Sequence, residues 1–414
     1  MTTIYPDELK WLNVTRAVAV RVVPIVGLVA FLADQACTNE PRPTRPPGVS
    51  EWSVSTEPYS VVGREGDPHL EFHHIAGVAT LRDGGLVVAD GASDQLRVLS
   101  RSGEFIRVFG RSGDGPGEFR GLAGIMTRGD TILAFDLAFR AAARFQAFRE
   151  VQGFVWGTTL RPRDGSPSAT PAAILSSLAL VVMRGGWRVV TPPPEGTIAR
   201  DTVALGVVQL GGAADSQVVR WLGAFPNNAW FSYQLPPGGP VQRSMGRYTL
   251  GPSLVVGTSG RRVWIGDTGT GIIKVFSSDG SPVMQMQFPL PPRTLDEAAL
   301  QRARAAALAR VTDPDIAGER ARINALYSLE LRPAMAPRFT RFTAGVDNEM
   351  WVECFSEMQT AEHCAVVLDP AGRLVGGATI PAGLELRAVD RDRIVGVHTD
   401  ADGVQRIVMH RLTR

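Results

Sequence analysis

The sequence predicts an all-β protein built from repeated small sheets, and three observations support this fold class. Glycine and proline are frequent, with 44 and 29 of 414 residues, while charged residues make up only 20%, which favours many turns over long exposed helices. Short apolar strands alternate with Asp-Gly and Ser-Gly turns from about residue 70 onward. This pattern recurs about every 40–50 residues, a period that is typical of a β-propeller, a ring of four-stranded blades.

The N-terminus carries the features of an export signal. Three basic residues precede an apolar run at 22–32, which suits a signal peptide and is too short for a bilayer that needs about 20 residues. The run leads to Cys37, and a proline-rich tether follows at 38–50. The segment resembles a bacterial lipoprotein signal, in which Cys37 would be acylated. Ordinary secretion and an uncleaved anchor stay open, because Asp34 and Gln35 stand where such signals carry Leu and a small residue.

The chain therefore divides into three parts, which are a signal peptide (1–37), a tether (38–50) and a propeller (51–414). Within the propeller, residues 168–244 contain less regular strands, which we count as one long blade. The regular blades are predicted over residues 75–109, 122–145, 254–288, 339–380 and 386–412. The total is six blades, with seven as the alternative.

Closure of the ring needs a strand from the front of the chain. The last blade supplies only three strands of its own. We expect Trp52-Ser-Val-Ser or Tyr59-Ser-Val-Val to provide the fourth, which would remove the exposed edges of an open sheet.

The first blade carries a family resemblance. Leu86-Val-Val-Ala-Asp90, Leu96-Arg-Val-Leu99 and Phe109-Gly-Arg-Ser-Gly-Asp-Gly-Pro-Gly-Glu-Phe119 resemble the NHL-repeat type of six-bladed propeller. In that family a blade ends in Phe-Gly, and a glycine-rich loop ends in Gly-x-Phe. With the export signal, the chain is similar to propeller proteins of bacterial cell envelopes, most of which have no assigned reaction. The resemblance implies a fold more firmly than an activity.

Strand parity predicts one loop-rich face. The loops between second and third strands and the crossings between blades should share one end of the ring. The glycine-rich crossing at 110–118 belongs to this face, and its charged residues Arg111, Asp114 and Glu118 are our candidate binding residues. The loop lacks the Gly-Lys-Ser/Thr ending and the helix of a phosphate-binding loop, so we expect its glycines to permit positive φ in a tight crossing.

Residues 294–332 are predicted to form a helical pair inserted between two blades. Thr294 with Glu297 suggests a capping box, strong helix formers follow through Arg310, and a second helix is expected over 316–329. Its place between blades predicts either a lid or docking surface on the loop-rich face, or a cover over a blade edge.

Cys354 and Cys364 are predicted to form a disulfide. Their flanks look like two strands of a hairpin, and a loop centred near Gln359 would place the two cysteines opposite each other, with Val352 facing Val366. Opposed strand residues lie within disulfide range, and export to an oxidising compartment would allow the bond. Ordinary buried thiols and a metal site using Glu353 and His363 are the alternatives.

Other singled-out residues are interpreted as structural. Carboxylates recur at the ends of second strands and should accept backbone N–H bonds of the following loops. Paired tryptophans should pack between blades, and clustered histidines should pack in a turn or face solvent, with metal binding as the alternative. These residues are Asp90, Asp136 and Asp267, Trp264 and Trp351, and His69, His73 and His74.

The sequence favours a binding function. Because 43 basic residues nearly balance 41 acidic ones, the chain offers no field for nucleic acid or a membrane surface, so membrane contact is expected only through an N-terminal lipid or anchor. No Gly-x-Ser-x-Gly or His-Glu-x-x-His motif is present. We expect a non-catalytic, monomeric, cofactor-free protein of the cell envelope, periplasmic or outer-membrane-anchored, that binds a protein, peptide or glycan.

Two other functions stay open. One is a channel-centred lactonase or lyase that uses a divalent cation such as calcium. The other is a sensor or assembly module that docks a partner through the helical insert.

Overall fold

The computed structural model describes most of the chain from residue 49 to its last residue. The predicted signal peptide, Cys37 and the tether up to residue 48 lie outside the described residues. Within the propeller, the residues not described are 129–130, 137–143, 150–151, 160–169, 177–178, 185–192, 195, 210–217, 236–242, 310, 312–316, 329–330, 358–360 and 401. No helix of the described part is long and apolar enough to cross a membrane.

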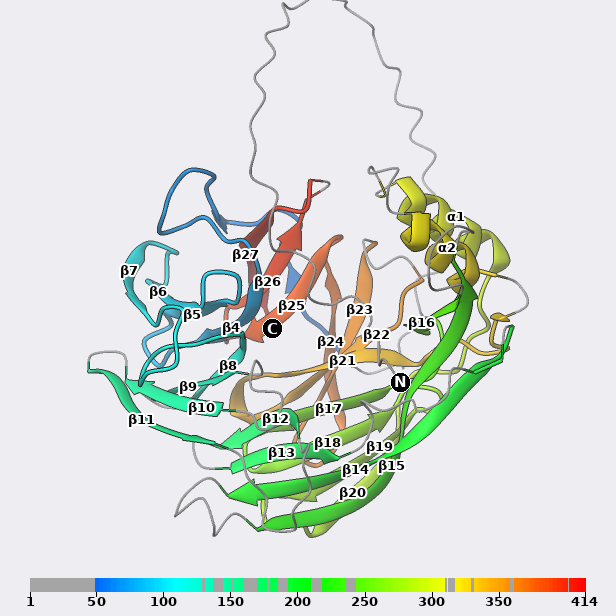
Figure 1. The fold of residues 1–414 in the computed structure, drawn as a ribbon. Helices are drawn as coiled ribbons and strands as arrows, with labels where there is room; N and C mark the ends of the chain where they lie inside the picture. Colours follow the sequence, from blue (N-terminus) through cyan, green and yellow to red (C-terminus); the bar gives the residue numbers. More distant parts are fainter. Residues whose placement is uncertain are drawn as a thin grey trace, which may run out of the picture. The chain divides into compact units, whose positions relative to one another are not determined.

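The described residues form six sheets that follow one another along the chain, as Figure 1 shows. Sheet I contains β4 (Ile75–Thr80), β5 (Leu86–Asp90), β6 (Gln95–Leu99) and β7 (Phe105–Phe109). Sheet II contains β8 (Leu122–Arg128), β9 (Thr131–Asp136), β10 (Arg144–Arg149) and β11 (Gly153–Thr159). Sheet III contains β12 (Thr170–Ser176), β13 (Ala179–Arg184), β14 (Ile198–Gln209), β15 (Val219–Gln234) and β16 (Arg243–Arg247).

The other three sheets come from the second half of the chain and its front. Sheet IV contains β17 (Leu254–Ser259), β18 (Arg262–Asp267), β19 (Ile272–Ser277) and β20 (Pro282–Gln287). Sheet V contains β21 (Phe339–Ala344), β22 (Met350–Cys354), β23 (His363–Leu368), β24 (Leu374–Ile380) and β1 (Ser50–Glu51). Sheet VI contains β25 (Leu384–Val389), β26 (Arg393–Thr399), β27 (Gln405–Thr413), β2 (Ser53–Val54) and β3 (Ser60–Val62).

Each sheet buries both faces against its neighbours. Six apolar clusters lie between sheets I and II, II and III, III and IV, IV and V, V and VI, and VI and I. The two tryptophans predicted to pack between blades take part, and both are fully buried. Trp264 lies between sheets IV and V, and Trp351 lies between sheets V and VI. The first strands of neighbouring sheets contact one another at every junction except that between sheets II and III, for which no such contact is described, and in Figure 1 the first strands surround the centre of the ring. The predicted β-propeller is confirmed.

The front of the chain closes the ring, as expected. Strands β2 and β3 both pair antiparallel with β27, and the shorter β1 adds a parallel fifth strand to β24 of sheet V, which the sequence pattern did not predict. Between them, Trp52 packs 5.5 Å from Trp351, measured between ring centroids. The N–H of Ile75 in the first sheet donates to Gln405 Oε1 of the last sheet at 2.6 Å.

A buried guanidinium fastens the same junction. Arg393, only 1% exposed, pairs with Asp390 at 2.7 Å. Its other nitrogens donate to the main-chain oxygens of Arg101, at 2.9 Å, and Gly84, both in turns of sheet I. The last and first sheets are therefore joined by hydrogen bonds as well as by apolar packing.

The irregular middle segment forms one sheet, as counted from the sequence. Its β14 and β15 make a long hairpin with register shifts after Arg200 and Leu205. The fifth strand, β16, lies outside β15.

The helical insert consists of α1 (Glu297–Ala309) and α2 (Ala317–Leu326). The predicted cap at Thr294 is wrong, because the Asp296 carboxylate accepts the N–H groups of Ala298 and Ala299, each at 3.1 Å, and aspartate is a preferred N-cap. Apolar residues of the insert pack against the outer part of sheet III and against Phe355 of sheet V. The described contacts therefore favour the second expectation, a cover over a blade edge. The shared cluster contains Ala229, Phe231, Tyr233, Tyr248, Leu250, Leu295, Leu300, Leu326, Leu331, Ala336 and Phe355.

Candidate functional site

The glycine-rich crossing between sheets I and II forms a loop held by its own hydrogen bonds. Gly110 and Gly117 adopt φ values of 82° and 78°, conformations that favour glycine, as predicted. The Phe119 N–H donates to Arg111 O, and the Gly113 N–H donates to Phe119 O, both at 2.8 Å. The crossing is thus a tight turn of fixed shape.

The three candidate residues of this loop all take part in ion pairs. Arg111 pairs with Glu118 at 2.6 Å, and Asp114 pairs with Arg120. A hydrogen bond from the Gly115 N–H and, as the next largest cause, one from Arg111 lower the pKa of the Glu118 carboxyl group. A hydrogen bond from Arg120 lowers the pKa of the Asp114 carboxyl group. Both carboxylates therefore stay ionised and hold the loop. Arg111, with a side chain 78% exposed, presents most of its surface to solvent.

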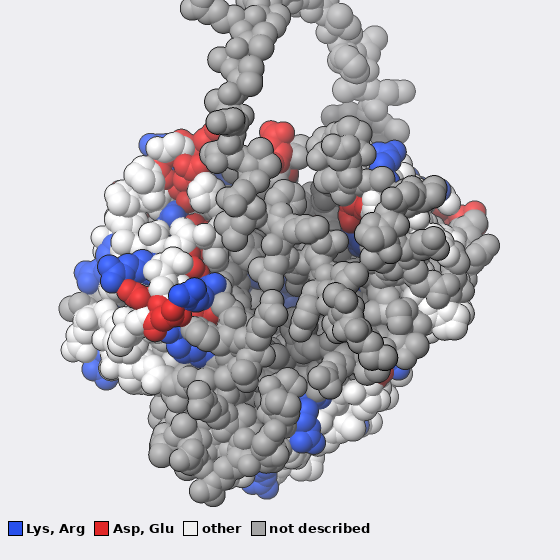
Figure 2. Space-filling model, viewed as in Figure 1, with Lys and Arg blue, Asp and Glu red and all other residues white. Residues whose placement is uncertain are grey.

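Side chains of sheet II form further hydrogen bonds and an ion pair that hold the same loop. Arg144 donates to Asp114 O at 2.8 Å and pairs with the fully buried Asp136 at 3.1 Å. Gln146 donates to Glu118 O and accepts the Gly117 N–H, both at 2.6 Å. Acidic and basic side chains lie next to each other on the left of the face in Figure 2.

The repeated aspartates accept backbone N–H bonds, as expected. The loop after the second strand donates to Asp90 through Ala92, at 3.3 Å, and to Asp267, whereas other bonds come from segments that precede the first strands. Asp90 accepts the His74 N–H at 3.1 Å, and Asp136 accepts the Arg120 N–H at 2.8 Å. In sheet IV, Asp267 accepts the Gly269 N–H at 3.0 Å. Each carboxylate thus ties loop backbone to the end of a second strand.

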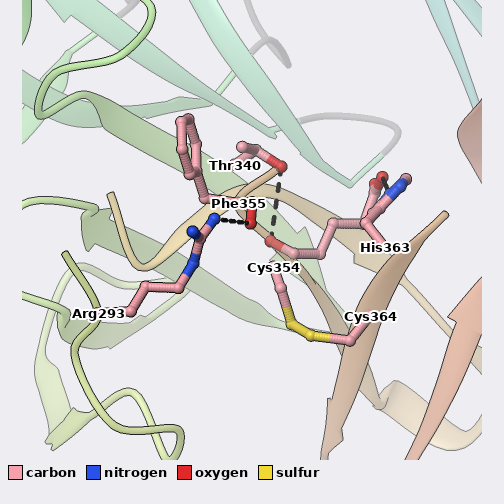
Figure 3. Close-up of a disulfide and its surroundings, with 7 residues drawn as sticks. Arg293, Thr340, Cys354, Phe355, His363 and Cys364 are labelled. Atoms are coloured by element: carbon pink, nitrogen blue, oxygen red, sulfur yellow. Dashed lines mark hydrogen bonds and ion pairs between the residues drawn. A yellow bond between two sulfur atoms is a disulfide. The ribbon is translucent and has the colours of Figure 1, made fainter. Parts of the chain in front are cut away.

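A disulfide lies at the corresponding place in sheet V. Cys354 and Cys364 are bonded, with 5.2 Å between their Cα atoms, and Val352 pairs with Val366 as predicted. Figure 3 shows Arg293, which precedes α1, reaching toward this end of the sheet. Arg293 donates to Phe355 O at 3.0 Å. The end of β22 is therefore held by the disulfide and, at Phe355, by the residue that precedes the helical insert.

A charged cluster lies on the other face of sheet V, where its first strand meets the first strand of sheet VI. We call Arg341, Glu353, His363, Glu385 and Arg387 the axial cluster. Arg341 pairs with Glu385, which also pairs with Arg387 at 3.0 Å. Glu353, with a side chain 5% exposed, accepts a hydrogen bond from His363 Nε2 at 3.1 Å, and its other oxygen lies 3.6 Å from Arg341 Nε.

Burial shapes the protonation of the axial cluster. Burial lowers the pKa of Arg387, and the positive charge of Arg341 lowers it further. Burial opposes ionisation of Glu385, but its pKa lies below the ordinary value because Arg341 and Arg387 stabilise the carboxylate. Arg341 and Arg387 therefore keep the Glu385 carboxylate ionised.

Sequence reasoning named Glu353 and His363, as an alternative metal site, but missed Arg341, Glu385 and Arg387, although a signal was present. The first strands β4, β12 and β17 contain no charged residue, and β8 contains one, at its last position. Strands β21 and β25 carry Arg341, Glu385 and Arg387. A comparison of first strands across the repeat would have separated these two strands from the others.

The clustered histidines occupy a turn in front of sheet I. His69 stacks on Phe105 with 4.2 Å between ring centroids, and His73 and His74 are exposed. Across the described ranges, no group of three or more His, Cys, Asp or Glu side chains is placed to hold a metal ion.

Comparisons with known proteins support the fold. No family model matches the chain, and no curated protein matches it in sequence. Among solved structures, a member of the DUF4221 family from Bacteroides vulgatus matches with a TM-score of 0.50 at 10% identity, covering 88% of this chain and 98% of the other. A Bacteroides fragilis protein inferred to be exported gives 0.46 at 13% identity, covering 90% and 98%. Virginiamycin B lyase from Staphylococcus aureus gives 0.37 at 9% identity, covering 88% and 100%. At 10% identity the likeness to the DUF4221 member concerns the fold alone. The sheets described above make the chain a β-propeller.

Proposed function

We propose that this protein is an exported, six-bladed β-propeller that binds a protein, peptide or glycan on its loop-rich face without catalysis. Export through the N-terminal signal, with acylation of Cys37, would hold it at the cell envelope as a monomer. The disulfide supports an oxidising location, because such bonds persist outside the cytosol.

The observation that carries the binding proposal is the fixed shape of the crossing loop. Arg111, Asp114 and Glu118 are held by ion pairs and hydrogen bonds in the free protein. A surface that is already ordered loses less conformational entropy on association than a flexible one does. Arg111 combines this fixed position with high exposure, as an arginine that contacts a partner requires.

A pair of matched charge reversals tests the proposal. Arg111 and Arg373 are 78% and 79% exposed, and each pairs with a carboxylate. Arg373 lies in the turn between β23 and β24, at the opposite end of the blades. Full-length protein is screened against peptide and glycan arrays, and the affinity of each hit is measured by calorimetry.

We expect Arg111→Glu to weaken binding by about tenfold or more and Arg373→Glu to leave it unchanged. Equal effects of the two substitutions, with native circular dichroism, would contradict binding on the loop-rich face. Absence of any saturable ligand in both arrays would contradict the proposed function itself.

A further inference from the structure

We propose that the Cys354–Cys364 disulfide is a redox-sensitive clamp that holds the helical insert against sheet V, and that its reduction by a dithiol releases the insert from this sheet. The inference concerns the chain segment that begins at Phe355, directly after the first cysteine. It goes beyond the proposed binding function and does not depend on it.

The segment that follows the first cysteine connects sheet V to the insert. Arg293 Nη2 donates to the main-chain oxygen of Phe355 at 3.0 Å and to Glu357 Oε2 at 2.9 Å (Figure 3 shows the first of these bonds). The guanidinium group also lies 5.6 Å from the centre of the Phe355 ring. Arg293 precedes the insert, and its main-chain oxygen accepts the N–H of Ala336, which follows the insert, at 2.9 Å. Both ends of the insert are therefore joined to this segment through Arg293.

Burial strengthens the connection. Phe355 is 8% exposed and lies in one apolar cluster with Leu295, Leu300 and Leu326 of the insert. The side chain of Glu357 is only 10% exposed, so separation from Arg293 would leave a nearly buried carboxylate without its partner, which is costly. The docking of the insert on sheet V therefore depends on the positions of Phe355 and Glu357.

The disulfide fixes these positions. Phe355 and Glu357 lie inside the loop that the disulfide closes, because the two cysteines are 10 residues apart. The described backbone pairs between β22 and β23 end with Glu353 and Ala365, and the disulfide lies just beyond this last pair. A closed loop has fewer accessible conformations than an open one. Reduction therefore gives the segment more conformational freedom and holds Phe355 and Glu357 less firmly.

The insert has a second attachment that does not involve the disulfide. The hydroxyl group of Tyr248 donates to Leu331 O at 2.7 Å, and Tyr248 is fully buried. Phe231 and Tyr233 of sheet III belong to the apolar cluster of the insert as well. We therefore expect reduction to loosen the insert from sheet V while the insert stays attached to sheet III.

The redox step is a thiol–disulfide exchange. Cys364 is partly exposed, whereas Cys354 is 8% exposed, so we expect a thiolate of the dithiol to attack the sulfur of Cys364. The bond between the two cysteine sulfurs breaks, and Cys354 leaves as a thiolate. The second sulfur of the dithiol then displaces Cys364 and closes a cyclic disulfide. Two electrons pass from the dithiol to the protein, and the two cysteine thiolates take up the two protons that the dithiol loses.

Hydrogen–deuterium exchange followed by mass spectrometry tests the clamp, because amide exchange reports the free energy of local opening. The full-length protein is measured oxidised, after reduction by dithiothreitol, and as a Cys354→Ala, Cys364→Ala variant. We expect amide exchange in α1 and α2 to become about tenfold faster or more in both disulfide-free forms. The reduced wild type keeps every side chain, so the test does not require the variant to fold.

Two single variants separate the clamp from a general loss of stability. Arg293→Gln removes the ion pair and leaves the disulfide intact. It should accelerate exchange in the insert, and reduction should then add less than it does in the wild type, because the two changes act on the same contact. Trp52→Ala weakens the junction between sheets V and VI without touching the insert, and it should leave exchange in the insert unchanged.

Four results would overturn the inference. The first is a disulfide that dithiothreitol does not reduce in the folded protein, and the second is unchanged exchange of the insert in both disulfide-free forms. The third is an equal acceleration in Trp52→Ala, which would show that the insert responds to overall stability alone. The fourth is full additivity of Arg293→Gln and reduction, which would show that the disulfide does not act through the Arg293 contact.

Discussion

Loss of the Cys354–Cys364 disulfide is expected to lower the free energy of unfolding by about 2.7 kcal/mol. The cysteines are separated by 10 residues. The chain-entropy relation for a loop of this length gives about 9 cal/mol/K, which corresponds to about 2.7 kcal/mol at 25 °C. The folded state should persist, because the pairs Val352–Val366 and Glu353–Ala365 keep the strands in register.

The measurement compares guanidinium denaturation of the wild type with that of a Cys354→Ala, Cys364→Ala variant, followed by tryptophan fluorescence. Trp351 is fully buried in the same sheet and should report its opening. Reduction of the wild type gives a second value in which the sulfur atoms remain, and a Cys37→Ser background removes the third thiol. A loss below about 0.5 kcal/mol in both experiments, or a reductant effect of equal size in the double variant, would refute the reasoning.

Three further predictions concern the ring and one turn. Trp52→Ala should cost about 3–5 kcal/mol in denaturant unfolding, because Trp52 is only 8% exposed between sheets V and VI; an effect no larger than that of Trp52→Phe would contradict this packing role. Arg393→Met should lower the free energy of unfolding by about 3–5 kcal/mol in the same assay, because it leaves buried acceptors between sheets VI and I unpaired. An unchanged free energy of unfolding would show that the guanidinium group does not hold these two sheets together. Hydrogen bonds from Ser277 and Ser281 lower the pKa of Asp279 from 3.8 to about 2. The contribution of this carboxylate to stability is therefore present above pH 4 and is lost as the pH falls toward 2. Carbon NMR of the carboxyl group should find a titration midpoint near 2, and a midpoint near 3.8 would contradict the prediction.

Repetition made much of the fold predictable. A hairpin constrains opposed residues, so the register of Val352 with Val366 followed from the loop length alone. The closing strands were also foreseeable, because a blade with three strands leaves an edge that another segment must cover. The parallel pairing of Ser50 and Glu51 with β24 left no such signal, since two residues carry no periodicity.

The remaining errors concern one helix cap and contacts whose partners are distant in sequence. Asp296 rather than Thr294 caps α1 because of where the preceding loop places each side chain. The sequence analysis assigned no role to Arg393, because the two carbonyl oxygens that its guanidinium group contacts come from turns of sheet I. The axial cluster likewise depends on two first strands meeting at the centre, which no single repeat specifies.

The pairing of β2 and β3 with β27 has a consequence for biogenesis. Ser55 and its partner His410 lie 355 residues apart, so the ribosome produces one side of this sheet long before the other. The earlier strands must stay unpaired while the intervening sheets are synthesised, and long-range pairings of this kind form slowly. A nascent chain released too early, or cut before β27, would expose an unfinished edge and be prone to aggregation.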